Sequence, residues 1–484
     1  MVSRNTGSVY KTSIKQLAAF PSTVIPFTLG AGVLLLSGIL GYMADRLPLM
    51  LVLGSIGGLV FILIALRSMP LALTLLLVAT GTVGFTIGTG TATPIPFAMP
   101  VLALLVGIWL SRMVFVERGI HLAYSPVNLP FLAFVGSALV SWIAGYAFWD
   151  WRVPGQGNLL MVQVGQLAIF AMTVAALLLV LNHRLTEAYL KLWTAILIVL
   201  GVISYATWVF IRYYGIFPKG GGTIIVWAVV LLWAQLLFNP SLKPWMRLAG
   251  LGITLFWAYW VYTQVFVWKG GWLTSVMAFL ILLWFKSRRA FLVLAFALLM
   301  IVASNWSFLG PRLVGVELSS GSTLRTLYWY DVIRMTSRSV LLGLGPANYK
   351  LDWYEPSFIP LSRLASGWDT WNAWGYSPTS HNTFVDIFAQ TGLIGLGFFA
   401  WGLGASWLIS YRIAARLPPG FLKGYAFAVF SGIAALIVAS FAFADWLLPF
   451  VYNLTITGFG HTVYSWLLLG SLLAFQAQKG ENDA

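Results

Sequence analysis

Long apolar runs separated by short polar links fill almost the whole chain. A helix that crosses a bilayer needs roughly 20 mainly apolar residues, and about fourteen runs reach or approach this length. The pattern predicts an all-α polytopic membrane protein with 12–14 transmembrane helices. The predicted spans lie near residues 22–43, 48–66, 69–89, 97–115, 128–148, 159–181, 191–211, 223–238, 249–267, 272–285, 290–308, 382–409, 424–446 and 455–476.

One long segment is too polar to cross a membrane. It runs from about Trp306 to Phe384, and an apolar run follows it. The segment divides the chain into an N-terminal transmembrane bundle (1–305), a large loop (306–381) and C-terminal transmembrane helices (382–484). Because the rest of the chain is apolar helix, we expect this loop, which contains short helices of its own, to carry the chemistry.

Composition supports a membrane protein and argues against a nucleic-acid partner. The 484 residues are 60% hydrophobic and 8% charged, whereas soluble domains carry about a quarter charged residues. The net charge of +15 comes mostly from cations in the short links, which points to membrane topology. The chain has no cysteine, so it has no disulfide and no thiolate metal site.

The distribution of basic residues predicts the orientation, because cytoplasmic loops carry an excess of Lys and Arg. Basic residues recur in alternate links, starting from Arg4, Lys11 and Lys15 at the N-terminus. This alternation places both termini in the cytoplasm and the 306–381 loop outside. The opposite short links hold only Arg46, Arg152, Arg212, Lys219 and Lys269.

Three cations on the predicted outer side are candidates for binding an anion. Arg212 follows an apolar run, and Lys269 sits in a tight glycine-containing turn between two spans. Snorkelling toward headgroups is the alternative explanation for both. Arg325 falls in the first turn of a helix predicted at about 324–340, where the macrodipole disfavours a cation. On the same helix Asp331, Arg334 and Arg338 share a face, which is typical of a solvated or ion-paired surface.

His381 is the candidate general base. We expect it in the first turn of the apolar helix that follows the loop, with Thr379 or Ser380 as the N-cap. The positive end of the helix dipole would favour a neutral imidazole there, and a neutral imidazole can accept a proton. A capping or interfacial histidine is the alternative. The acids of the loop are scattered, so we expect neither a catalytic metal nor a cofactor.

Three ordered motifs resemble the O-antigen ligase and polymerase superfamily (Wzy_C-type membrane glycosyltransferases). The strongest is Ser380-His381-Asn382-Thr383-Phe384 followed by Gln390-Thr391-Gly392-Leu393-Ile394-Gly395. The others are Leu324-Arg325-Thr326-Leu327-Tyr328-Trp329 and Gly343-Leu344-Gly345-Pro346-Ala347-Asn348-Tyr349. The resemblance covers about residues 200–410 and implies a GT-C-like fold in the bacterial inner membrane, with an extracytoplasmic active site.

The resemblance also implies residue roles. His381 is similar to the family's base or acceptor-positioning residue. The implied diphosphate contacts are Arg325, Lys269 and Arg212, and the implied sugar or acceptor contacts are Trp329, Tyr349 and Asn382. Two departures stand out: Lys269 occupies a position where the family usually has Arg, and Gln390 replaces a frequent Glu. A lysine can neutralise a phosphate but cannot provide a bidentate fork, so the arginine clamp that the resemblance implies is not matched at this position.

The implied reaction is metal-independent, inverting transfer of a glycan from undecaprenyl diphosphate to an acceptor hydroxyl. The acceptor separates three branches: a ligase uses lipid A–core, a polymerase uses another lipid-linked repeat, and a protein O-oligosaccharyltransferase uses Ser or Thr. We favour the ligase branch. A flippase of lipid-linked glycans is the alternative from another class, although the spans hold few of the ionisable residues that ion-coupled carriers use.

Overall fold

The computed structural model describes residues 49–88, 94–153, 158–183, 185–210, 221–265, 269–307, 322–349, 380–442, 446–452 and 455–482. The chain forms two units, Met1–Ser68 and Met69–Ala484. The first unit contributes helix α3 (Leu49–Arg67), and the second contains all other described elements. The division at the polar loop, into 1–305, 306–381 and 382–484, stays a prediction about where function lies.

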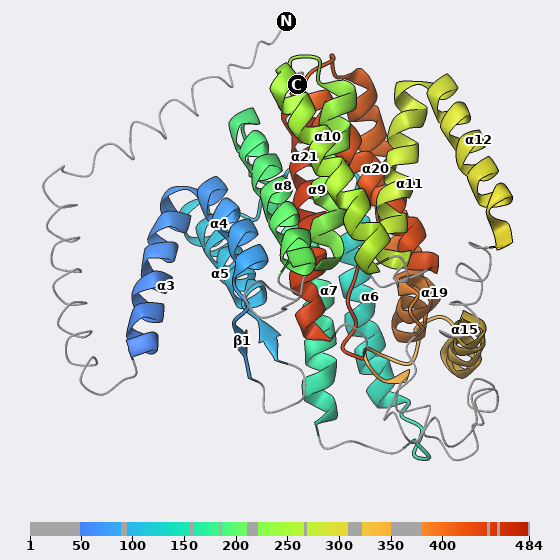
Figure 1. Ribbon diagram of the computed structural model, residues 1–484. Helices are drawn as coiled ribbons and strands as arrows, with labels where there is room; N and C mark the ends of the chain where they lie inside the picture. Colours follow the sequence, from blue (N-terminus) through green and yellow to red (C-terminus); the bar gives the residue numbers. More distant parts are fainter. Residues whose placement is uncertain are drawn as a thin grey trace, which may run out of the picture. The chain divides into compact units, whose positions relative to one another are not determined.

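The second unit is a helical bundle with one short hairpin (Figure 1). In the hairpin, β1 (Thr86–Ile87) runs antiparallel to β2 (Ile95–Pro96). The helices are α4 (Met69–Thr82), α5 (Ala98–Ser111) with the π-helix η1 (Arg112–Val116), α6 (Asn128–Ala147), α7 (Leu159–Leu181), α8 (Glu187–Phe210), α9 (Gly221–Phe238), α10 (Pro244–Trp260) with the π-helix η2 (Val261–Val265), α11 (Lys269–Lys286), α12 (Arg288–Ser304), α15 (Ser322–Thr336) with the 3-10 turn η4 (Ser337–Ser339), α19 (Thr383–Arg416), α20 (Phe421–Ala442), the 3-10 turn η5 (Ile456–Gly458) and α21 (Phe459–Asn482).

The helices confirm the all-α membrane architecture. A helix occupies every predicted span except the one near 22–43, which lies outside the described residues. Within the described ranges, seven helices are long and apolar enough to cross a membrane. They are Ala98–Val116, Asn128–Ala147, Leu159–Leu181, Glu187–Thr207, Thr383–Arg416, Phe421–Phe441 and Ile456–Phe475. Shorter apolar helices include Met69–Thr82, Thr223–Phe238 and Gly270–Lys286.

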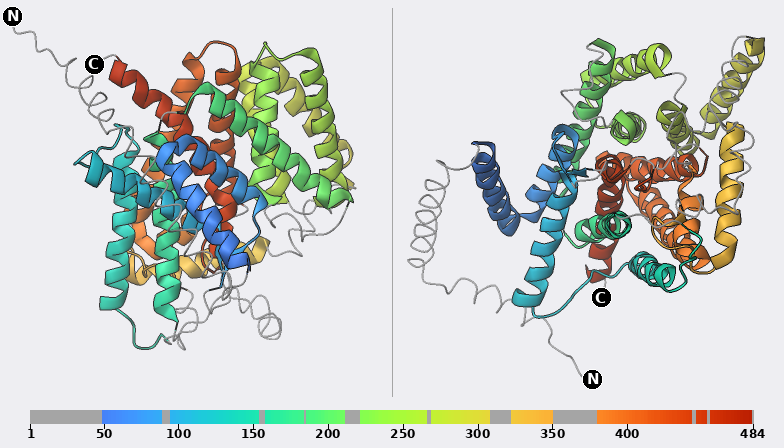
Figure 2. Two further views of the ribbon diagram at one scale, coloured as in Figure 1. Left: turned by 90° about the vertical axis from the view of Figure 1, so that its left-hand side faces the viewer. Right: turned by 90° about the horizontal axis from the view of Figure 1, so that it is seen from below.

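Close backbone approach and interhelical hydrogen bonds hold the bundle together. Helix α8 packs on α9, α6 on α19, and α7 on α21 (Figure 2). A Cβ added to Gly470 would meet the carbonyl oxygen of Leu177 at 2.7 Å, the kind of contact that small residues permit between membrane helices. The Trp227 indole donates to Ser465 Oγ at 2.9 Å across α9 and α21. Such bonds satisfy polar groups that lipid cannot.

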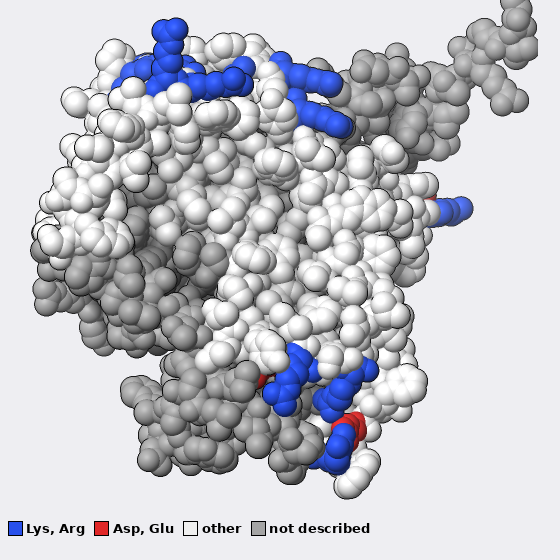
Figure 3. All heavy atoms as spheres, turned by 90° about the vertical axis from the view of Figure 1, so that its right-hand side faces the viewer, with Lys and Arg blue, Asp and Glu red and all other residues white. Residues whose placement is uncertain are grey.

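Four of the links predicted to be cytoplasmic, near 184–191, 239–247, 286–289 and 416–423, meet at one end of this unit. Gly420 N–H donates to Phe238 O at 3.1 Å. Lys286 Nζ lies 5.6 Å from the centre of the Phe238 ring, and Lys191 Nζ lies 5.5 Å from that of Phe421. Figure 3 shows Lys and Arg gathered at both ends of the face it draws, with few charged side chains in the broad band between. This arrangement suits a bilayer around the middle of the bundle.

Candidate functional site

The site is organised around a kink in α19. Gly392 has φ 66° and ψ −168°, so the helix is interrupted there. The Gly343-Leu344-Gly345 segment after η4 lies against the kink, with both glycines at positive φ. A Cβ on Gly392 would meet Leu341 O at 2.2 Å, and one on Gly343 would meet Thr391 N at 2.6 Å. Two of the motifs found in the sequence therefore form a single backbone-to-backbone joint.

Hydrogen bonds close this joint on both sides of the kink. Leu344 N–H donates to Ala389 O at 2.8 Å, and Leu393 N–H donates to Val340 O at 2.9 Å. The Gln390 side chain also takes part, because its Oε1 accepts from Ala347 N–H at 2.9 Å. Carbonyl and amide groups freed by the break in α19 thus find partners in the 340–347 segment.

Helices α6 and α7 lock the joint from the other side. Ser141 Oγ donates to Gln390 O at 2.5 Å, and Gly145 allows the chain at Leu344 to pass, since a Cβ would meet Leu344 O at 2.7 Å. Gln163 of α7 donates to Asn348 Oδ1. The glycine and amide residues of these motifs therefore act as scaffold, which gives a physical reason for their spacing.

The residue that caps the N-terminus of α19 differs from the predicted one. Asn382 is the N-cap, and neither Thr379 nor Ser380 takes that position. Asn382 Oδ1 accepts from Phe384 N–H at 3.0 Å and Val385 N–H at 3.2 Å. Its Nδ2 donates to Phe441 O at 2.8 Å and ties α19 to α20. The amide of Asn can serve both contacts at once, whereas a hydroxyl cap has no second donor arm of this reach.

His381 therefore precedes the N-cap. The prediction that it lies in the first turn of the helix is wrong. It is partly buried, and its backbone has φ 48°. Residues other than glycine are uncommon at positive φ, although His is among the types found there more often, and unusual backbone of this kind concentrates at functional sites. The flanking bonds hold the strain in place, because Ser380 Oγ accepts from Asn382 N–H and donates to Asn382 O, both at 3.0 Å.

Helix α15 joins the site through Trp329. Its Nε1 donates to Ser380 O at 2.6 Å, next to His381. The Trp329 ring also lies 6.1 Å from the ring of Phe441. The structure thus brings Trp329, His381 and Asn382 together. Arg325 precedes Trp329 by one helical turn, and residues four apart share a helix face. The position of Arg325 is therefore on the side of α15 that faces the α19 N-terminus.

The predicted diphosphate contacts of Arg325, Lys269 and Arg212 stay predictions. The side chains of Arg325 and Lys269 and all of Arg212 lie outside the described residues. Lys269 begins α11. Asp331 on α15 is fully buried, whereas Arg334 on α15 and Arg338 in the following turn η4 are exposed. The face predicted to be solvated is therefore mixed, with its acid turned inward.

Tyr349 and Asn382 use their polar groups within the protein. Tyr349 is 1% exposed, packs against Val332 and Met335, and donates its hydroxyl to Asp386 Oδ1 at 2.8 Å. Contact of either residue with a sugar stays a prediction.

The sequence analysis did not identify Asp386, which is fully buried in the first turn of α19. An acid at that place in an apolar helix was the available signal.

Trp329→Phe tests the link between α15 and the α19 N-terminus. The variant keeps the ring and loses the indole donor, so Ser380 O loses its partner and His381 loses a neighbouring restraint. We expect transfer to fall about tenfold or more, since small misplacements of reacting groups are costly. The melting temperature in detergent should change little, because one such bond contributes about 1 kcal/mol. Trp401→Phe, at a 51% exposed position of α19, is the control; equal activities of the two variants would argue against this role.

Comparison with known proteins finds a family model that matches part of the chain. Residues 267–400 match the model of the O-antigen ligase family (Wzy_C). This range runs from the start of α11 through α15 to the α19 kink, and it contains both the glycine joint and His381. No curated protein sequence matches the chain. The resemblance inferred from the motifs is thereby confirmed over 267–400. The chain is a multi-pass membrane protein that carries an O-antigen ligase family domain at residues 267–400, which implies a ligase- or polymerase-type transferase.

Proposed function

We propose that the protein transfers a glycan from undecaprenyl diphosphate to an acceptor hydroxyl on the extracytoplasmic face of a bacterial inner membrane. The observation that carries the proposal is the convergence of Trp329, Ser380 and the strained His381 at the α19 N-terminus, inside a segment that matches the O-antigen ligase family. The basic links gathered at the opposite end of the bundle support an outward-facing site.

In the proposed reaction the acceptor hydroxyl attacks the anomeric carbon of the donor sugar. A new acceptor oxygen–carbon bond forms as the carbon–oxygen bond to the diphosphate breaks. His381 takes the hydroxyl proton, and undecaprenyl diphosphate leaves with the bonding electron pair. A single displacement of this kind inverts the anomeric centre. The backbone of His381, at φ 48°, is fixed by the hydrogen bonds between Ser380 and Asn382, and a general base must be held within reach of the proton that it takes.

The departing diphosphate needs positive charge. Arg325 is proposed as its principal contact, one turn from Trp329, with Lys269 and Arg212 as further cations. Fixed guanidinium groups stabilise negative charge that develops on phosphate oxygens. No metal is assigned a role in this scheme.

The decisive experiment is turnover of the purified full-length protein with an undecaprenyl-diphosphate glycan and three acceptors: lipid A–core, a second lipid-linked repeat and a Ser/Thr peptide. We expect one acceptor to be extended. The ligase branch stays our preference, and the product identifies the branch. Movement of the glycan lipid across a vesicle membrane without any transfer would support the flippase alternative.

Arg325→Ala and Arg325→Lys examine the phosphate contact in the same assay. We expect Ala to reduce transfer about a hundredfold or more, as loss of a single oxyanion-stabilising group does. Lys should restore only part of the rate, because it cannot form two parallel hydrogen bonds with a phosphate. Arg334→Ala, at an exposed position nine residues later on the same helix, serves as control. Full activity of Arg325→Ala would remove this residue from the mechanism.

A further inference from the structure

One buried carboxyl group close to His381 is not used in the proposed chemistry. Asp386 lies in the first turn of α19 and is 0% exposed. None of the ion pairs among the described residues includes it. An unpaired carboxylate away from water is costly, and ionisable residues within membrane helices usually serve a function. The presence of Asp386 at this place therefore requires a physical explanation.

Two hydroxyl groups are side-chain neighbours of this carboxyl. Tyr349 donates to Asp386 Oδ1 at 2.8 Å, and the Ser380 hydroxyl lies within hydrogen-bonding reach of the carboxyl. The backbone N–H of Asp386 also donates to Asn382 O at 3.0 Å. Asp386 thus interacts with the residues that precede and follow His381 in the chain.

The second carboxyl oxygen of Asp386 has no hydrogen-bond donor. Oδ2 is buried, and no residue in the described ranges donates to it. Ser380 does not, because its single hydroxyl hydrogen goes to Asn382 O at 3.0 Å. Ser380 Oγ accepts one hydrogen bond, from Asn382 N–H, and a hydroxyl oxygen has two lone pairs. An ionised Asp386 would therefore place two acceptors next to each other with no hydrogen between them.

A hydrogen on Oδ2 resolves this conflict. A protonated carboxyl is a donor at one oxygen and an acceptor at the other. Asp386 would then accept from Tyr349 and donate to Ser380 Oγ, while Ser380 keeps both bonds to Asn382. Every polar atom of the group then has a partner, as is usual for buried polar groups. The positive end of the α19 dipole favours an anion, but this effect is smaller than the cost of burying an unpaired carboxylate.

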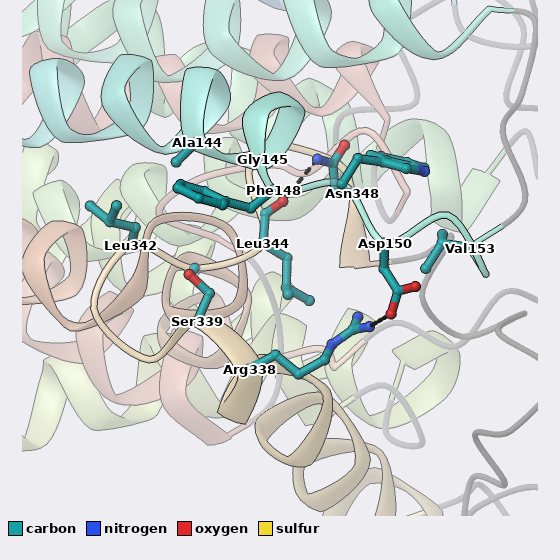
Figure 4. A pocket seen from close by; sticks show the side chains of 12 residues that line it. Ala144, Gly145, Phe148, Asp150, Val153, Arg338, Ser339, Leu342, Leu344 and Asn348 are labelled. Carbon is teal, nitrogen blue, oxygen red and sulfur yellow. Dashed lines mark hydrogen bonds and ion pairs between the residues drawn. The ribbon is translucent and has the colours of Figure 1, made fainter.

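The same carboxyl ties the turn before α19 to the glycine joint. Tyr349 follows Asn348, whose Nδ2 donates to Leu344 O at 2.8 Å (Figure 4). Leu344 N–H in turn donates to Ala389 O. The bond from Tyr349 to Asp386 therefore holds the first turn of α19 against a segment that is itself fixed to the kink.

We propose that Asp386 is a neutral carboxylic acid that donates a hydrogen bond from Oδ2 to Ser380 Oγ and thereby positions His381. The proposal rests on the function proposed above. The bond fixes the Ser380 hydroxyl, and the two bonds from that hydroxyl to Asn382 span His381 and hold its backbone at positive φ. Asp386 acts through Ser380 and takes no proton from the acceptor.

Infrared spectroscopy measures the protonation state directly. A protonated carboxyl has a C=O stretching band that an ionised carboxyl lacks. The native full-length protein and Asp386→Asn are compared at neutral pH in a detergent without ester groups. We expect this band in the native protein and its loss in Asp386→Asn. Labelling the aspartate side-chain carboxyls with ¹³C should shift the band and so assign it to an aspartate.

Asp150→Asn is the matched spectroscopic control, because Asp150 is ionised. Asp150 lines the pocket drawn in Figure 4, and its Oδ2 lies 2.8 Å from Arg152 Nη2 and 2.9 Å from Arg338 Nη1. The hydrogen bond from Arg152, with attraction from Arg338, holds the pKa of the Asp150 carboxyl well below its usual range. Asp150→Asn should therefore remove no such band. A native protein without an Asp386 band would overturn the proposal.

Two substitutions at Asp386 separate hydrogen bonding from charge. Asn can replace both bonds, because its carbonyl accepts from Tyr349 and its amide donates to Ser380, so at least about half of the transfer rate should remain. Leu makes neither bond, and kcat should fall about tenfold or more with KM unchanged, since the base is displaced. If Leu alone folds poorly, Asp386→Leu/Tyr349→Phe removes both partners of the buried bond and is the milder change.

The position of His381 can be followed without any turnover. In protein with ¹³C-labelled histidine, the NMR signal that is missing from His381→Ala belongs to His381. This signal should shift or broaden in Asp386→Leu and stay in place in Asp386→Asn.

Three results would overturn the proposal besides a missing infrared band. They are an Asn variant as inactive as the Leu variant, a Leu variant with native kcat, and a His381 signal that is the same in Asp386→Leu as in the native protein. If the native protein transfers no glycan to any acceptor, the proposed function is refuted, whereas the infrared band and the His381 signal still decide the role of Asp386. The two failures are therefore distinguishable.

Discussion

Replacing His381 with Ala is expected to reduce glycan transfer about 10²- to 10⁴-fold, the range of a lost general base. The folded protein should survive the change. The positive-φ backbone at His381 is held by hydrogen bonds between Ser380 and Asn382 that do not involve the imidazole. The measurement is turnover with a lipid-linked glycan alongside a melting curve in detergent. The rate should fall while the melting temperature stays within a few degrees.

His381→Asn and His121→Ala make this result specific. Asn tolerates the αL region but cannot accept a proton near neutral pH, so it should be as inactive as Ala while straining the backbone less. His121 is exposed and lies between α5 and α6, so its removal should leave transfer intact. Transfer at more than about a tenth of the native rate by His381→Asn would leave no proton-accepting role for this residue.

The helical architecture could be predicted because each helix is recognisable from its own stretch of sequence. Apolar length alone places the helices, and the spacing of cations predicts which ends meet, as the contacts of Lys191 and Lys286 then show. The joint between Gly343 and Gly392 could not be predicted in the same way. The sequence contains two glycine motifs about fifty residues apart. Neither motif by itself indicates that their backbones are in contact in the folded protein.

The prediction that Thr379 or Ser380 is the N-cap of α19 was wrong for a related reason. Thr379 and Ser380 have suitable hydroxyls, and local preference ranks them close to Asn. The choice is made by Phe441, whose carbonyl lies within 2.8 Å of the Asn382 amide. That contact comes from α20, 59 residues later in the chain, so a rule based on local sequence could not predict it. Local sequence also gave no indication that Asp150 forms an ion pair with Arg338, because the two residues are far apart in the chain.

Gly392→Ala is expected to be the most destabilising single change in the described part of the chain. Its φ of 66° and ψ of −168° fall in a region that is essentially restricted to glycine and costs other residues about 1–3 kcal/mol. The new Cβ would also stand 2.2 Å from the carbonyl oxygen of Leu341. Neither backbone can withdraw without breaking the bonds from Leu393 to Val340 and from Leu344 to Ala389.

The total loss should therefore exceed about 4 kcal/mol, a size reached only where a specific structural feature is destroyed. Little folded protein should accumulate in the membrane, and what is recovered should melt well below the native protein. Gly397→Ala is the matched control on the same helix, because a Cβ there meets nothing within 4 Å. It should be neutral or stabilise α19 by up to about 1 kcal/mol, since Ala is the better helix former. Equal melting temperatures for the two variants would mean that the 340–347 segment does not dock on the kink, and the support it gives to His381 would have to come from elsewhere.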